Sequence, residues 1–174
     1  MERWPKQKSY RPSKNSSYSL SKIYLYNAQR DLPFSLPSMR KAISFLLQEL
    51  RITTDEVSFH FVTERKICEL HKEFFNDPTP TDCITFPLDA LEEKKGSFHI
   101  LGEAFICPRT ALLYSKTHKM DPFQELYRYV IHCLLHLIGY TDTDPQQRAK
   151  MKRKENAYLK KIIQEGFLKY TRRD

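Results

Sequence analysis

The chain has 174 residues, of which 40% are hydrophobic and 29% charged, a composition typical of a soluble globular protein with one substantial core. The longest apolar run, residues 129–140, contains two histidines and is too short and too polar to span a bilayer, so we expect no membrane association. The net charge of +8 is concentrated at the ends, with +5 in residues 1–22 and +7 in residues 148–174. Such basic ends favour a polyanionic partner, nucleic acid before membrane, or serve only solubility.

The N-terminal 21 residues are polar and basic and have no apolar centre, so they are not a secretory signal. We expect residues 1–21 to be a disordered basic tail. Residues 22–168 are predicted to form a single domain, and residues 169–174 a short basic C-terminal tail.

Strands and helices alternate in the first part of the predicted domain. Residues 22–27 and 55–63 alternate polar and apolar side chains, which predicts two strands. Residues 34–50 begin with Ser and Pro and keep a helical apolar period, which predicts a helix between these strands. A short amphipathic helix is predicted over residues 64–75, before a segment rich in Pro and Asp.

The second part is predicted to contain two strands and then three helices. Strands are expected at residues 83–87 and 98–108, close enough in sequence to pair antiparallel, and helices begin at Pro108, Pro122 and Pro145. The order βαβαββααα predicts an α/β (α+β) domain, in which helices pack on a small mixed four-stranded sheet.

The cysteines indicate a reducing compartment. None of them belongs to a Cys-x-x-Cys pair, and each has apolar neighbours; they are Cys68, Cys83, Cys107 and Cys133. We expect reduced, buried thiols in a cytoplasmic protein, without a disulfide framework or a cysteine-based zinc site.

The segment "HCLLHLIGYTDTD", residues 132–144, carries the strongest chemical signal. His132 and His136 are four residues apart on a predicted helix, so their rings face the same point. Gly139 can end the helix and turn the chain back, which brings Asp142 or Asp144 to the same place. Three protein ligands with an open fourth position are typical of a catalytic zinc site, although two buried core histidines would show the same spacing. We predict one divalent metal, zinc, on the His-x-x-x-His helix.

A zinc peptidase is the first enzyme class to consider for such a helix. Peptidases of the His-Glu-x-x-His type use the glutamate after the first histidine as general base. Cys133 occupies that position here, which argues against this class.

Three blocks together resemble the YbeY family of bacterial metal-dependent endoribonucleases. They are "PTDCITFP" (80–87), "LGEAFICPRTA" (101–111) and "HCLLHLIGYTD" (132–142), in the order in which that family has them. The resemblance implies a single-strand-specific endoribonuclease of the bacterial cytoplasm that acts in ribosomal RNA maturation, at the 3' end of 16S rRNA, and in ribosome quality control. It also implies ribosomal RNA and the ribosome or its proteins as partners.

The chain departs from the family pattern at the site. Asp142 stands where the family has its third metal-binding histidine, which favours Asp142 over Asp144 as the third ligand. Phe75 stands where the family usually has an arginine, and Lys72, one turn earlier, could supply a charge in its place or be an ordinary surface lysine.

Further residues are assigned more loosely. Thr85 and Arg109 are predicted, with Lys72, to line an RNA cleft. No general base is predicted, because Asp82 and Glu103 in the matching blocks fit structural positions better. The changes at 75 and 142 leave a second hypothesis, an RNA- or ribosome-binding factor with weakened or lost catalysis.

Overall fold

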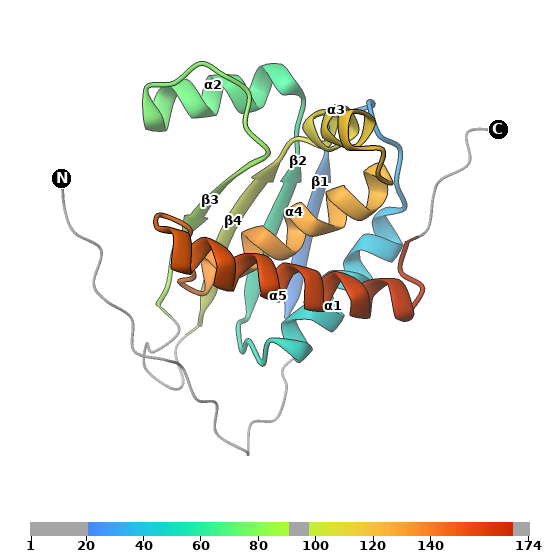
Figure 1. Cartoon of the computed structure of the whole chain (residues 1–174). Coiled ribbons are helices and arrows are strands. Elements are labelled where there is room, and N and C mark those ends of the chain that lie inside the picture. The colour runs from blue at the N-terminus through green and yellow to red at the C-terminus, as the bar shows by residue number, and fades with distance from the viewer. Residues whose placement is uncertain (1–20, 91–97, 169–174) are drawn as a thin grey trace.

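The computed structural model describes residues 21–90 and 98–168 (Figure 1). The predicted tails fall on residues 1–20 and 169–174, outside the described part. The elements follow the predicted order. They are β1 (Lys22–Asn27), α1 (Leu36–Glu49), β2 (Glu56–Phe61), α2 (Glu64–Phe75), β3 (Cys83–Pro87), β4 (Ile100–Ile106), α3 (Pro108–His118), α4 (Pro122–Leu137) and α5 (Pro145–Gln164).

The four strands form one mixed sheet in the order β1-β2-β4-β3. β1 pairs parallel with β2, and β2 parallel with β4, while β3 pairs antiparallel with β4. The predicted mixed sheet and the antiparallel pair are therefore confirmed. Because side chains alternate along a strand, Cys83 and Thr85 of β3 lie on one face of the sheet and Phe86 lies on the other.

One face of the sheet carries the main core. Val57, Phe59 and Phe61 of β2 are fully buried there, as their alternation predicts, against apolar residues of α1 and α4. α4 contacts β3 and β4, and α5 lies along α4 (Figure 1). α2 packs separately beside β3, where Ile67 and Ile84 belong to a second, smaller cluster.

Local hydrogen bonds set where the helices begin. The side chains of Ser35, Thr63, Asp121 and Asp144 each accept a backbone N–H in the first turn of α1, α2, α4 and α5. The starts of two helices also explain why two strands end earlier than predicted. Thr63 starts α2 and Cys107 starts α3, so neither residue belongs to the preceding strand.

Gly102 permits the close approach of α4 to the sheet. Its φ of 144° lies in a region that other residues rarely adopt, and a Cβ there would lie 2.4 Å from the carbonyl oxygen of Phe86 and 2.8 Å from Cδ2 of Leu137. Leu137 is the last residue of α4, so this glycine fixes how near the end of α4 comes to β3 and β4.

No helix in residues 21–90 and 98–168 combines the length and the apolar character that crossing a membrane requires.

Candidate metal centre

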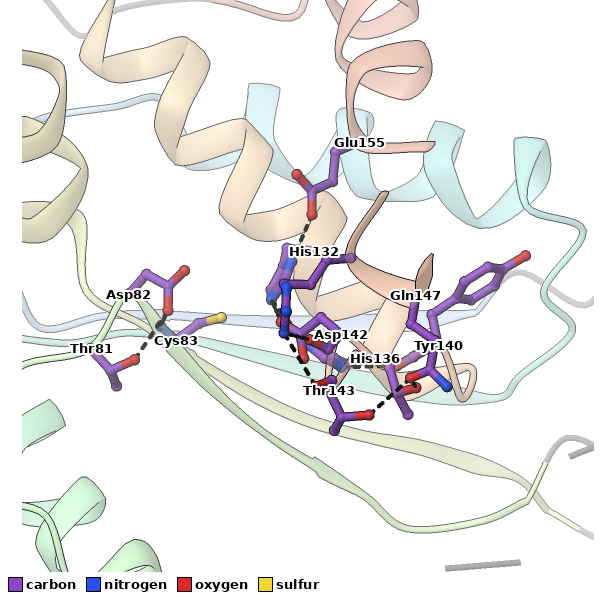
Figure 2. A network of polar contacts seen from close by, with 12 residues as sticks. Thr81, Asp82, Cys83, His132, His136, Tyr140, Asp142, Thr143, Gln147 and Glu155 are labelled. Atoms are coloured by element: carbon purple, nitrogen blue, oxygen red, sulfur yellow. Dashed lines mark hydrogen bonds and ion pairs between the residues drawn. The ribbon is translucent and has the colours of Figure 1, made fainter. Parts of the chain in front are cut away.

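The last two turns of α4 and the loop after it bring the three predicted ligands together (Figure 2). Nε2 of His132 lies 2.9 Å from Nε2 of His136. Oδ2 of Asp142 lies 3.9 Å from Nε2 of His132 and 3.8 Å from Nε2 of His136. The spacing of four residues on one helix thus has the predicted result, two imidazoles directed at one point.

Hydrogen bonds at the far nitrogens set which ring atoms are available. Nδ1 of His132 donates to Oε1 of Glu155 over 2.7 Å, and Nδ1 of His136 donates to the carbonyl oxygen of Tyr140 over 2.9 Å. A carboxylate and a carbonyl can only accept, so in each neutral ring the proton is on Nδ1. The lone pair of Nε2 is then available to bind a metal. Both lone pairs face the space beside Asp142.

The turn after α4 places Asp142. Gly139 has a φ of 88°, and its N–H donates to the carbonyl oxygen of His136 over 2.9 Å, which turns the chain back. Nη1 of Arg148 donates to the carbonyl oxygens of Asp142 and Thr143, 3.0 and 3.2 Å away. Gln147 accepts from the Thr143 hydroxyl over 3.0 Å (Figure 2). The first turn of α5 therefore holds the loop in place.

Asp144 has a different partner. Its Oδ1 accepts the N–H of Gln147 over 2.8 Å, which makes Asp144 the N-cap of α5. The geometry brings Asp142, and not Asp144, beside both imidazoles.

Glu155 is a site residue that the sequence analysis missed. It is 8% exposed on α5, and its Oε2 lies 3.8 Å from Nη1 of Arg128. Arg128 in turn donates to Glu125 over 3.3 Å and to Asn156 over 2.7 Å. One signal was present, because Glu155 occupies the apolar stripe of α5 with Met151, Leu159 and Ile162.

Burial and charge move the two histidine pKa values in opposite directions. Burial lowers the pKa of His132, but the Glu155 hydrogen bond and the charges of Asp82, Glu155 and Asp142 together outweigh it, so the net shift is upward. Burial and the neighbouring His132 lower the pKa of His136, against the charge of Asp142. His132 is therefore the ring that holds a proton more firmly when no cation is bound.

The donor set fits a divalent cation. Two neutral imidazole nitrogens and one carboxylate oxygen lie within 4.8 Å of one another, and these are ligand types that zinc accepts. Ligands of a tetrahedral zinc ion are about 3.3 Å apart, by its usual bond lengths. The three observed separations, 2.9, 3.8 and 3.9 Å, lie on both sides of that value. The residues present could thus hold a metal with a further position left for water or substrate.

A cavity of about 450 Å³ opens beside His132. It lies between the start of β3, α3, α4 and α5, and Asp82, Arg128, Tyr129 and Glu155 are among the residues that line it. For Asp82 the sequence favours a structural position over a general base, and its Oδ1 does accept from the Cys83 N–H and the Thr81 hydroxyl, over 2.8 and 3.1 Å.

The predicted cleft residues lie elsewhere. Lys72 is exposed in the last turn of α2, and Phe75, at the end of α2, is 58% exposed. Arg109 pairs with Glu64 and Asp31, at 3.0 and 3.2 Å. Thr85 lies on the sheet face that α4 covers, but none of Lys72, Thr85 and Arg109 lines the cavity described above. Their roles toward RNA stay predictions.

Cys133 is fully buried. Its thiol is in hydrogen-bonding contact with Cys83, and this contact and burial raise the pKa of the Cys83 thiol well above its ordinary value. The residue after the first histidine thus faces the protein interior, away from any substrate. The cysteines of the described part are all free thiols; Cys107 and Cys133 are buried as predicted, whereas Cys68 and Cys83 are only partly buried.

Comparisons with known proteins match most of the chain to one family. The family model described as "Endoribonuclease YbeY" matches residues 25–163. The chain is 42% identical over 139 residues to an "Endoribonuclease YbeY" of Protochlamydia amoebophila, which covers 78% of this chain and 91% of the relative. It is 40% identical over 141 residues to one of Chlamydia felis, covering 79% and 89%. The solution structure of TM1509 from Thermotoga maritima is similar with a TM-score of 0.60 and 25% identity, over 83% of this chain and 91% of that one.

Proposed function

The chain belongs to the YbeY family, and from that premise we propose that it is a metal-dependent endoribonuclease that cuts single-stranded RNA. The convergence of Nε2 of His132, Nε2 of His136 and Oδ2 of Asp142 supports this most strongly. The names of the relatives describe an endoribonuclease.

Each residue of the proposed site has a distinct role. His132 and His136 offer Nε2 to the cation, and Asp142 offers Oδ2. Glu155 orients His132 and raises its basicity as a ligand, because a carboxylate that accepts from the far nitrogen pushes electron density into the ring. A bound divalent cation would supply polarisation of a phosphoryl oxygen and activation of water.

We propose zinc as the metal. Bound here, it would be a weaker Lewis acid than zinc held by three imidazoles. The carboxylate of Asp142 reduces the positive charge of the centre, which raises the pKa of a bound water and favours tolerance of harder cations such as Mn²⁺.

A basic face on α5 supports RNA as the substrate. Nζ of Lys150 and Nζ of Lys154 each lie 5.1 Å from the ring centroid of Tyr140, the residue whose carbonyl holds His136. Lys161 lies on the same side of α5, where its Nζ is 5.5 Å from the ring centroid of Tyr158 and Nζ of Lys154 is 5.9 Å from it. Other exposed cations are distributed around the helix; they are Arg148, Lys152, Arg153 and Lys160. Lysines and arginines bind phosphates without reading sequence, so this face would hold an RNA strand near the metal.

The proposed biological role is more specific. We propose ribosomal RNA as the substrate, with action in rRNA maturation at the 3' end of 16S rRNA and in ribosome quality control, and the ribosome or its proteins as partners in the cytoplasm. The net charge of +8 and the basic face of α5 are compatible with such a partner.

Cleavage of a labelled RNA with one single-stranded and one duplex segment tests the activity. The protein is stripped with a chelator and reloaded with Zn²⁺ or Mn²⁺, and His136→Ala is compared with His118→Ala, a matched change at an exposed histidine of α3. We expect cleavage of the single-stranded segment by reloaded wild type and by His118→Ala, and a loss of at least about 100-fold in His136→Ala.

The alternatives give different results in the same assay. If metal-loaded wild type binds this RNA but leaves it intact, the protein is an RNA-binding factor and not a nuclease. A zinc peptidase is disfavoured, because the buried thiol of Cys133 stands where such enzymes need a carboxylate base. Co-sedimentation with 30S ribosomal particles measures binding to them and so tests the proposed ribosomal partner.

A further inference from the structure

Asp82, Cys83 and His132 form a second group of possible ligands next to the first. One ligand atom from each of these residues lies within 4.8 Å of the other two. We propose that they form a second position for the cation, selective for thiophilic metals such as Zn²⁺ and Co²⁺. The proposal rests on the proposed metal centre, because both positions use His132.

The carboxylate of this group is fixed at the start of β3. Oδ1 of Asp82 accepts from the Thr81 hydroxyl and from the N–H of Cys83, so this one oxygen makes both hydrogen bonds of the turn. The carbonyl oxygen of Asp82 accepts the N–H of Cys107 over 2.9 Å, so the backbone here is tied to the end of β4. Figure 2 shows Asp82 and Cys83 beside His132. The second oxygen, Oδ2, can therefore serve a cation without loosening the strand.

The thiol of this group faces the same space. Cys83 pairs with Ile106 in the antiparallel ladder, and the buried Ile106 belongs to the core under α4, so Cys83 points toward that helix. Contact with the Cys133 thiol and burial raise the pKa of Cys83, so a cation must displace the thiol proton to bind there. Thiolate ligands select Zn²⁺ and related soft cations over Mg²⁺ and Ca²⁺. When a cation binds Cys83, the thiol proton is released to solvent.

The two positions exclude each other because they compete for one nitrogen. Nδ1 of His132 donates to Glu155, so Nε2 is the only nitrogen of this ring that can bind a cation. A cation on Nε2 is held either with His136 and Asp142 or with Asp82 and Cys83. We therefore expect one cation per chain at either position, with thiolate ligation favoured by softer metals.

Asp82 and His132 both line the cavity beside α4, which gives ions and water a route to the second position.

Cobalt spectroscopy separates the two positions without any activity measurement. Stripped protein is titrated with Co²⁺ alone, and the near-ultraviolet thiolate-to-cobalt charge-transfer absorption is recorded per bound cobalt. The proteins are wild type, His136→Ala, Cys83→Ser, the double variant His136→Ala with Cys83→Ser, and Cys68→Ser as a matched control on α2. Circular dichroism of each variant identifies any that fails to fold.

We expect one cobalt per chain and charge-transfer absorption in wild type. In His136→Ala the absorption per cobalt increases, because only the Asp82–Cys83–His132 position keeps all its ligands. Cys83→Ser abolishes the absorption while cobalt stays bound, the double variant loses most of its affinity, and Cys68→Ser matches wild type.

Folded His136→Ala that binds no cobalt, or binds it without this absorption, overturns the second position. Absorption that survives Cys83→Ser overturns it as well, because the sulfur would then belong to another residue. If wild type binds cobalt but neither wild type nor His136→Ala shows the absorption, the second position is excluded and the proposed nuclease site is not. If wild type binds no metal, both proposed cation positions are excluded.

Discussion

Nδ1 of His132 donates to Oε1 of the buried Glu155 over 2.7 Å, and this bond joins the candidate ligand on α4 to an acid on α5. Glu155→Gln keeps the shape but removes the charge that increases the basicity of the ring. We expect Zn²⁺ affinity to fall about 10- to 100-fold, measured by competition with a chromophoric chelator. Glu165→Gln, at the exposed end of α5, should keep the affinity of wild type. Equal affinity in the two variants would show that Glu155 does not support the site.

The same ion pair predicts a pH dependence in the metal-free protein. The pKa of His132 is raised in the fold, since Glu155 and the nearby acids outweigh burial. A histidine with a raised folded-state pKa stabilises the fold below its unfolded pKa of about 6.5, and this contribution is lost as the pH rises through the folded-state value. We expect Glu155→Gln to lower the free energy of unfolding by about 1–3 kcal/mol more at about pH 5.5 than at about pH 9, in urea titrations with chelator present. A larger cost at the higher pH would contradict this.

Metal should stabilise the fold through His132. A cation that binds only the folded chain adds about 4 kcal/mol at a concentration about 1,000 times its dissociation constant. We expect Zn²⁺ to raise the melting temperature of stripped wild type, and a chelator to reverse the rise. His132→Ala removes the ligand that both proposed positions use, so its melting temperature should not respond to Zn²⁺, whereas His118→Ala should respond like wild type.

Gly102 offers a test of how the sheet positions the end of α4. Gly102→Ala places a Cβ 2.4 Å from the carbonyl oxygen of Phe86, in a backbone conformation that alanine rarely adopts. We expect a loss of about 3 kcal/mol or more in the free energy of unfolding. Gly166 also has a positive φ, 69°, but a Cβ there would meet nothing within 4 Å, so Gly166→Ala should cost only about 1 kcal/mol. Similar losses in both variants would mean that the close approach of α4 contributes little.

The basic face of α5 predicts a change in the salt dependence of RNA binding. Replacing Lys150 and Lys154 by alanine removes two cations beside Tyr140. If each contacts one phosphate, the slope of log affinity against log salt should decrease in magnitude by roughly 1.4 on single-stranded RNA. Lys41→Ala, an exposed change on α1, should leave the slope unchanged. An unchanged slope in the double variant would place the RNA elsewhere.

The local sequence was sufficient for the elements and for the two histidines. The helix over 64–75 and the strands over 22–27 and 83–87 have the predicted bounds, since caps, breakers and side-chain alternation act over a few residues. His132 and His136 face one point because helical spacing alone dictates it. Asp142 required one more local fact, that Asp144 caps α5.

The rest of the site depends on packing between distant segments. Glu155 reaches His132 only because α5 lies along α4, and Cys83 reaches it only because α4 crosses β3. Arg109 was assigned to an RNA cleft, but the fold places Asp31 and Glu64 beside its guanidinium. None of these contacts follows from spacing along the chain, because each joins residues more than 20 positions apart.

A circular single-stranded RNA is the decisive substrate for the proposed nuclease, because a circle has no ends and only an endonuclease can open it. Wild type and His136→Ala are each stripped, reloaded with Zn²⁺, and incubated with the circle under the same conditions. We expect linear product with reloaded wild type, none with stripped wild type, and at least about 100-fold less with His136→Ala. A circle that stays intact with fully loaded wild type, or is opened equally well by His136→Ala, would contradict a metal-dependent endonuclease centred on His132, His136 and Asp142.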